Sequence, residues 1–268
     1  MDAPRISRPV LALFRHIVRG YFRRHFHAVR LRGGEHFAAA SHAREPLILY
    51  ANHIGWWDPM VAFLLAEKFM PERRHFAPMD ADALERYRIL KHVGVFPVEL
   101  NTGRGAVQFL RTGEAIVTGA GVLWVTPQGK FVDSRNTALE FKPGLAALAA
   151  RVAANAGVCR VLPLAIEYTF WDERLPECLL LAREAVQVSR DETAEAIEAR
   201  LISELQIAMQ ELKQMAMRRD ASLFDTIAYG RVGPGGFYAL GRRLKALFTR
   251  QPYRSEHTIV PIVREGHE

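Results

Sequence analysis

The central part of the chain alternates short apolar runs with longer segments in which apolar residues recur every three or four positions. The short runs predict β-strands, and the longer segments predict amphipathic helices. Strands are expected at 47–51, 75–78, 95–98, 122–126, 160–167 and 179–183. Helices are expected at 59–69, 82–91, 104–118 and 144–155, followed by one long charged helix at 192–218. This alternation predicts an α/β fold with a mixed sheet flanked by helices.

Both ends of the chain carry basic amphipathic segments. After Pro9, arginines alternate with apolar residues at helical spacing, namely Val10, Leu13, Phe14, Ile17, Val18, Tyr21 and Phe22. A similar segment, 237–248, follows the turn-forming glycines at 233–236. Each helix either packs on the protein body or lies in a membrane interface, and their occurrence at both ends favours membrane contact. We therefore expect a membrane-contact helix over 1–32, an α/β domain over 33–190, and a helical extension over 191–268 on the core or the membrane.

Composition and charge narrow the setting. The chain has 268 residues, of which 49% are hydrophobic, enough for one substantial core. A net charge of +7 favours an acidic partner such as phospholipid headgroups, nucleic acid or a phosphorylated small molecule. Arginines interrupt every apolar run before it reaches the roughly 20 residues of a membrane span. Cys159 and Cys178 lack the spacing of a metal site or a disulfide framework, which fits a reducing, cytosolic environment.

The segment ANHIGWWDPM, at 51–60, places a histidine and an aspartate five positions apart. On a straight α-helix His53 and Asp58 would point about 140° apart. The apolar run before them, the flexible Gly55 and the Asp58-Pro59 helix start predict a strand, a turn and a helix instead. Such a turn can bring both side chains together, so that Asp58 binds one imidazole nitrogen and the other takes a proton from a hydroxyl. Alternatively, Asp58 only caps its helix and His53 is a structural turn residue.

The string Asn-His-x-x-x-x-Asp, between an apolar strand and an apolar helix, resembles the first motif of the glycerolipid and lysophospholipid acyltransferase family, which includes the 1-acylglycerol-3-phosphate acyltransferases. Further segments follow in that family's order. They are Gly94-Val95-Phe96-Pro97-Val98 (second motif), Pro127-Gln128-Gly129 (third), Phe141-Lys142-Pro143-Gly144 (its Phe-Lys-x-Gly) and Val161-Leu162-Pro163-Leu164 (fourth). The resemblance covers roughly residues 46–186 and implies an acyltransferase-like fold.

The resemblance also implies a reaction. Such enzymes transfer a fatty acyl group from a thioester, on coenzyme A or acyl carrier protein, to a lipid hydroxyl, so no cofactor or metal is expected. His53 would be the general base and Asp58 its orienting partner, and the backbone near Gly129 would stabilise the oxyanion. The expected substrate-binding residues are Asn52, Trp57, Gln128, Gly129, Lys130 and Pro163. The expected location is peripheral, at the cytoplasmic face of a membrane.

The motifs depart from the family where the acceptor's phosphate is recognised. The third motif usually reads Glu-Gly-Thr-Arg, and the second ends in arginine. Here these positions read Gln128-Gly129-Lys130-Phe131 and Glu99-Leu100. The loss of two guanidinium forks removes strong phosphate contacts and leaves the lipid acceptor open. Cations that could substitute for them are Arg104, Lys130, Arg135 and Lys142.

Alternative functions remain open at this point. A peripheral lipid-binding protein without catalysis would explain the altered third motif, and a metal-dependent hydrolase could use His53, Asp58, Asp80 and Asp82. A nucleic-acid partner is not expected, because the sequence has no zinc finger, RNP-like strand or clear helix-turn-helix. We expect one of Trp56 and Trp57 to be a core residue and the other to line the acyl channel or the membrane boundary.

Overall fold

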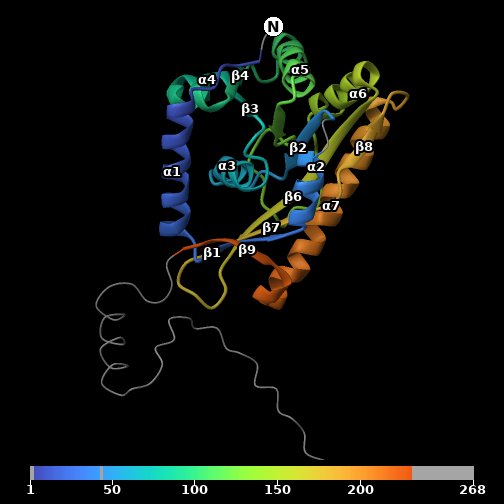
Figure 1. The fold of residues 1–268 in the computed structure, drawn as a ribbon. Helices are drawn as coiled ribbons and strands as arrows, with labels where there is room; N and C mark the ends of the chain where they lie inside the picture. Colours follow the sequence, from blue (N-terminus) through green and yellow to red (C-terminus); the bar gives the residue numbers. More distant parts are fainter. Residues whose placement is uncertain (1–2, 43–44, 231–268) are drawn as a thin grey trace, which may run out of the picture.

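The computed structural model describes residues 3–42 and 45–230, and within them a nine-stranded mixed sheet forms the centre of the fold (Figure 1). The strand order is β4-β3-β5-β2-β6-β7-β1-β9, with β8 paired to β6. The strands are β1 Ala28–Arg32, β2 Leu47–Ala51, β3 His75–Asp80, β4 Val95–Val98, β5 Val122–Val125, β6 Val158–Thr169, β7 Glu177–Ala182, β8 Val186–Ser189 and β9 Asp225–Tyr229. The α/β fold with a mixed sheet is therefore confirmed.

Helices cover both faces of this sheet. They are α1 Arg8–His25, α2 Gly34–His42, α3 Asp58–Phe69, α4 Ala81–Arg86, α5 Gly103–Thr118, α6 Gly144–Ala156 and α7 Ala194–Arg218, with short 3₁₀ helices at Arg88–Val93 (η1) and Ala221–Leu223 (η2). Residues of α1, α2 and α3 share one core cluster, and α5, α6 and the start of α7 share the other. In Figure 1, α1 and α7 accordingly lie on opposite sides of the molecule.

Strand β2 explains how the two cores are built. Its Ile48 and Tyr50 point into the α5–α7 core, whereas Leu47, Leu49 and Ala51 point into the α1–α3 core. A strand buried on both faces reads as a continuous apolar run, which is why this segment was recognisable in the sequence. Strands β4, β3, β5, β2 and β6 run parallel, so their carboxyl ends meet along one edge of the sheet. Binding sites of α/β proteins commonly lie at such an edge.

Each predicted strand has a counterpart, but β1, β8, β9 and α2 were not predicted. Residues 28–32, expected to be part of a terminal helix, instead form β1 inside the sheet, and β9 adds a strand from beyond residue 190. The sheet therefore includes strands from before residue 33 and from after residue 190 in the sequence. The helix expected at 82–91 is divided at Tyr87 into α4 and η1.

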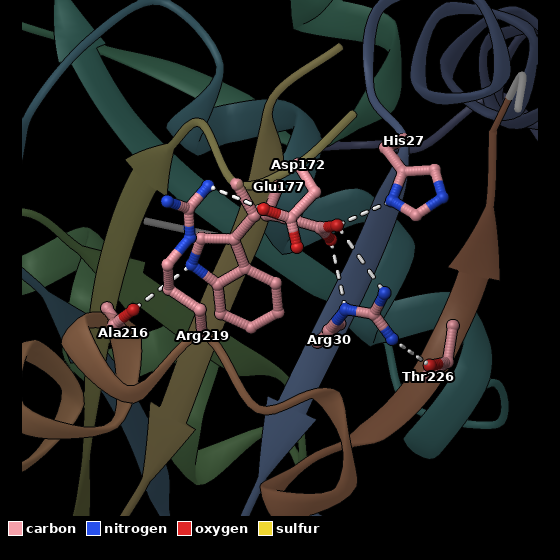
Figure 2. A network of polar contacts seen from close by, with 8 residues as sticks. His27, Arg30, Asp172, Glu177, Ala216, Arg219 and Thr226 are labelled. Atoms are coloured by element: carbon pink, nitrogen blue, oxygen red, sulfur yellow. Dashed lines mark hydrogen bonds and ion pairs between the residues drawn. The ribbon is translucent and has the colours of Figure 1, made fainter. Parts of the chain in front are cut away.

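A buried polar network explains how β1 tolerates charge (Figure 2). The Glu177 carboxylate on β7 accepts hydrogen bonds from His27 Nδ1 at 2.5 Å and from Arg30 Nε at 3.0 Å. Arg30 Nη1 also donates to Thr226 Oγ1 on β9 at 2.8 Å. Buried charges are tolerated when they are paired and hydrogen-bonded, so this network joins β7, β1 and β9 at one edge of the sheet.

Helix α1 divides its apolar stripe between the core and the surface. Val18 and Phe22 are buried in the α1–α3 core. Leu13, Ile17 and Tyr21, on the flank of the same stripe, are 59%, 41% and 40% exposed. One flank of the helix therefore packs on the body, as the first alternative expected, and the other leaves an apolar surface exposed. Within the described residues, no helix is both long enough and apolar enough to span a bilayer. The predicted segment 237–248 lies outside the described residues.

Candidate active site

The loop 52–57, which connects β2 to α3, carries the predicted His53, and Asp58 follows as the first residue of α3. Its first residue, Asn52, is buried and binds β6 through both ends of its amide. Asn52 Nδ2 donates to the Ile166 carbonyl at 2.9 Å, and the Ile166 N–H donates to Asn52 Oδ1 at 2.8 Å. These two bonds fix the start of the loop against β6, where the backbone pairing between β2 and β6 has ended.

His53 and Asp58 meet across this turn. His53 Nδ1 lies 2.7 Å from Asp58 Oδ2, and that oxygen also accepts from the backbone N–H groups of Ile54 and Gly55 at 2.8 and 3.0 Å. A carboxylate at Nδ1 requires a proton there, which leaves Nε2 as the nitrogen that can accept one. The expectation that Asp58 caps α3 is corrected, because its carboxylate binds the preceding turn and α3 itself begins at Asp58.

The carboxylate of Asp58 is nearly inaccessible, with 2% of its side chain exposed, while 18% of the His53 side chain is exposed. The second carboxylate oxygen, Oδ1, accepts a hydrogen bond of 2.8 Å from the Tyr168 hydroxyl on β6. Burial raises the pKa of Tyr168 well above its usual value, and nearby negative groups, including Asp58, raise it further. The phenol therefore stays protonated and donates to the carboxylate. Tyr168 was not predicted from the sequence.

The backbone of His53 is held by the segment that follows β5. The His53 N–H donates to Gln128 Oε1 at 2.8 Å, and the His53 carbonyl accepts from the Val132 N–H at 2.7 Å. The ring of Phe131 contacts the His53 imidazole edge-on, with 4.6 Å between the ring centroids. The segment that follows β5 and contains the third-motif resemblance thus binds both the N–H and the carbonyl of His53.

A cavity of about 710 Å³ opens beside His53 at the carboxyl edge of the parallel strands. Its wall includes His53 and Asp58, and it is mainly apolar. On the α3 side of the sheet it is lined by Ala51, Ala62, Ala77 and Trp124, and on the α5–α6 side by Val98, Phe109, Val125 and Leu145. A cavity of this size and character suits long apolar substrates. The imidazole therefore faces a space that can hold acyl chains.

The predicted site residues divide into two groups. His53, Asp58, Gly129 and Lys130 line the cavity. The other four, Asn52, Trp57, Gln128 and Pro163, are not among the lining residues, and their contact with substrate stays a prediction.

Each of these four has a different place. Asn52 binds β6, and Gln128 binds the His53 backbone. Pro163 pairs with Tyr50 inside the sheet. Trp57 is the core tryptophan of the pair and packs against Phe22 and Phe26, with ring centroids 6.0 and 4.9 Å away. Trp56 is 53% exposed, and its ring lies 6.2 Å from that of Tyr21, which places it at the surface.

A glycine is needed at position 129 for a structural reason. Its φ of +65° favours glycine, and a Cβ there would lie 2.5 Å from Lys142 Cε. The Gly129 N–H donates to the Thr126 carbonyl at 3.0 Å, so this amide itself is engaged and is not the expected oxyanion donor. The side chain of Lys142 crosses over Gly129, and its Nζ donates to Asn101 Oδ1 at 2.8 Å. Lys142 and Lys130 both line the cavity.

The other two candidate cations do not line this cavity. Arg135 Nη2 is paired with Asp133 at 2.6 Å, and Arg104 lies exposed in the first turn of α5. The hydrolase alternative required a metal-ligand group that includes Asp80. Among the described residues, no three His, Cys, Asp or Glu side chains are grouped to hold a metal ion. Asp80 instead caps α4 by accepting from the Ala83 N–H at 3.0 Å.

Comparison with known protein families matches residues 28–167, just over half of the chain, to the Acyltransferase family. The chain belongs to this family. It is therefore an acyltransferase, and the expected membership of an acyltransferase family is confirmed.

The fold of this acyltransferase is also similar to a solved structure, the 1-acyl-sn-glycerophosphate (LPA) acyltransferase PlsC from Thermotoga maritima. The TM-score is 0.55 at 15% identity, over 77% of this chain and 79% of that chain. No curated protein sequence matches the chain significantly.

Proposed function

We propose that this acyltransferase moves a fatty acyl group from a thioester, on coenzyme A or acyl carrier protein, to a hydroxyl of a lipid acceptor. The observation that carries the proposal is the 2.7 Å contact between His53 Nδ1 and Asp58 Oδ2, beside an apolar cavity. The contact leaves Nε2 as the proton acceptor of a histidine base. The His53–Asp58 pair thus lies beside a cavity that is large enough for an acyl chain.

In the proposed reaction, His53 Nε2 takes the proton of the acceptor hydroxyl while the hydroxyl oxygen attacks the thioester carbonyl. The resulting imidazolium is stabilised by the buried carboxylate of Asp58. When the tetrahedral intermediate collapses, the carbon–sulfur bond breaks and the thiolate leaves with the proton from His53. The products are an ester and a free thiol, and His53 returns to its neutral form without a covalent acyl-enzyme.

The acceptor is proposed to be a lipid alcohol, and its headgroup would contact Lys130 and Lys142. Both lysines line the cavity, whereas the arginines associated with phosphate recognition in the family are absent. A lysine ammonium is a point charge that contacts phosphate without the two-pronged geometry of arginine. The acceptor named for the Thermotoga maritima enzyme is 1-acyl-sn-glycerophosphate. Substitution of the arginines favours an acceptor without a phosphomonoester in this protein.

We further propose that the enzyme works as a peripheral protein at the cytoplasmic face of a membrane. The exposed residues Leu13, Ile17 and Tyr21 of α1, together with Trp56, form an apolar surface that we call the α1 patch. Trp56 belongs to the same loop as His53. Leu100 and Phe131 line the cavity and are themselves 37% and 61% exposed. Apolar surface of this kind, with α1 arginines beside it, suits an anionic lipid interface.

The experiment that tests the proposed function measures thiol release from acyl-coenzyme A and from acyl-acyl carrier protein. Each donor is offered without an acceptor, with a neutral lipid alcohol, and with a lysophosphatidate. An acyltransferase of the proposed kind releases thiol only when an acceptor is present, and it prefers the neutral alcohol. Release without any acceptor indicates a thioesterase, and absence of release with every donor and acceptor contradicts the proposal.

A further inference from the structure

Strand β6 extends beyond its neighbour β2 and carries a side chain into the candidate active site. Pairing between the two strands ends at Ala51 and Leu164, whereas β6 continues to Thr169. Over this extension β6 remains paired with β7, and the Asn52 amide holds Ile166 from the other side. Tyr168 follows two positions later. Because side chains of a strand alternate, Tyr168 lies on the same face as Ile166, which lines the cavity.

The two oxygens of the Asp58 carboxylate have unequal surroundings. Oδ2 is within hydrogen-bonding distance of three donors: His53 Nδ1 and the backbone N–H groups of Ile54 and Gly55. Oδ1 accepts from the Tyr168 hydroxyl at 2.8 Å. Without that hydroxyl, the buried carboxylate would lose its tie to β6. The loop alone would then set its orientation.

The phenol that makes this bond is itself fixed in place. The Tyr168 ring packs against Phe26, with 5.6 Å between ring centroids, and its backbone pairs with the buried Cys178 of β7. Phe26 in turn packs on Trp57, the residue before Asp58. The hydroxyl is therefore positioned by the sheet and by Phe26, neither of which belongs to the loop that carries His53.

We propose that Tyr168 is a positioning residue that holds the Asp58 carboxylate against His53 and stabilises its negative charge by donating a hydrogen bond. The catalytic consequence rests on the proposed function, but the effect on the dyad itself does not. Tyr168 does not need to touch substrate in this role. It acts through Asp58 on the orientation and the proton affinity of the imidazole.

Replacing the hydroxyl by hydrogen in Tyr168→Phe removes a donor and leaves the ring and its packing intact. The carboxylate then carries its charge with one hydrogen bond fewer and attracts the His53 proton more strongly. The pH midpoint of the His53 titration should move upward. The other titratable groups that face the pair are Cys178 on β7 and, in the cavity wall, Asp80, Glu99, Lys130 and Lys142, and they are unchanged in this variant.

The same substitution should lower kcat by roughly 10- to 100-fold, the range expected for losing a hydrogen bond to a charged group. KM should change by less than about twofold, since the hydroxyl does not contact substrate and orientation of the base matters in the transition state. A structural role alone would reduce the folded fraction without shifting a titration midpoint.

The test is NMR titration of the histidine side chains in wild-type protein, Tyr168→Phe and Tyr50→Phe, with His53→Ala to assign the His53 signal. Tyr50 is a matched control, because its buried hydroxyl donates to the Leu201 carbonyl at 2.9 Å in the opposite core. We expect an upward midpoint shift in Tyr168→Phe and no shift in Tyr50→Phe. An unchanged midpoint in Tyr168→Phe would overturn the inference.

A double-mutant comparison distinguishes the proposed role from a general loss of stability. In an Asp58→Asn background, Tyr168→Phe should have much less effect on the His53 midpoint, because the carboxylate that it acts through is gone. An equal midpoint shift in both backgrounds would contradict the proposed role. These titrations need no substrate. If wild-type protein transferred no acyl group, the proposed function would fail while the relationship between Tyr168 and His53 would still be tested.

Discussion

The side-chain carbonyl of Gln128 accepts a 2.8 Å hydrogen bond from the backbone N–H of His53, although the two residues are 75 positions apart. Gln128 is buried, and the bond itself is partly buried. It stands where the family usually has glutamate, and both side chains offer an acceptor oxygen at the same place. Gln128 therefore supports the loop that carries His53 and is not part of the cavity wall.

Gln128→Ala should lower kcat by about tenfold, because the partly buried His53 N–H loses its partner and the loop loses a restraint. Gln128→Glu should keep kcat within a few-fold of wild type, since the carboxylate retains the acceptor. Steady-state kinetics of both variants checks this, with thermal unfolding to measure stability. Equal loss of activity in the two variants would mean that the neutral amide itself is needed.

Asp58→Asn should reduce kcat by about 10³-fold or more, because a neutral amide neither stabilises the imidazolium nor enforces the required tautomer. Binding to anionic lipid vesicles should be unchanged, since the Asp58 side chain is buried and is not part of the α1 patch. The two quantities are measured by initial rates and by vesicle co-sedimentation. Parallel loss of both would show that Asp58 is needed for the fold and not specifically for the chemistry.

His75 makes stability depend on pH. Its Nδ1 accepts from Trp124 Nε1 at 3.0 Å and its Nε2 donates to the Met70 carbonyl at 2.9 Å, an arrangement that requires a neutral ring. Burial lowers the pKa of His75 to about 4. Between roughly pH 6.5 and 4 the unfolded chain binds this proton and the folded protein does not, so the free energy of unfolding falls as the pH falls.

The expected loss for His75 over that interval is roughly 3 kcal/mol. Denaturant unfolding at several pH values measures it. His75→Gln, which cannot titrate, should be less stable overall but should lose that part of the pH dependence. A wild-type curve that is flat from pH 6.5 to 4, or a curve unaltered by the substitution, would contradict the assignment.

The α1 patch is tested by changing Leu13, Ile17 and Tyr21 together to serine. These side chains are exposed, so the fold should be retained, whereas binding to anionic vesicles should fall by at least about tenfold because apolar area is lost from the interface. A deletion of residues 1–32 would not be equivalent, because it removes β1 from the sheet.

The control is a serine double substitution at Ile207 and Met217, two residues of α7 that are 40% and 58% exposed. Helix α7 lies on the opposite side of the molecule from α1 (Figure 1). Vesicle flotation should show normal binding for this control. If the α1 and α7 variants bind equally well, α1 does not contact the membrane through this patch.

Local patterns predicted the parts of the fold that depend on local contacts. Strands β2 and β4 begin and end where the apolar runs do. The pairing of His53 with Asp58 was foreseeable because the two residues are only five positions apart and a turn that contains Gly55 joins them. The contact between them does not depend on how the distant strands are arranged.

What could not be predicted depends on contacts between distant segments. Strand β1 carries Arg30, which reads as a surface residue until Glu177, 147 positions away, is placed beside it. Tyr168 reaches Asp58 over 110 positions, and only the register of β6 beside the loop reveals the contact. The packing of Trp57 against α1 and the pairing of Pro163 with Tyr50 in the sheet likewise depend on segments that are distant in the sequence.

The most direct test of the central claim follows an isotopically labelled acyl group from a thioester donor into a lipid ester by mass spectrometry. Wild-type protein should form the labelled ester and an equal amount of free thiol, and His53→Ala should form less than about a thousandth as much while remaining folded. Labelled ester formed by His53→Ala at a rate close to that of wild type would show that this histidine is not the base.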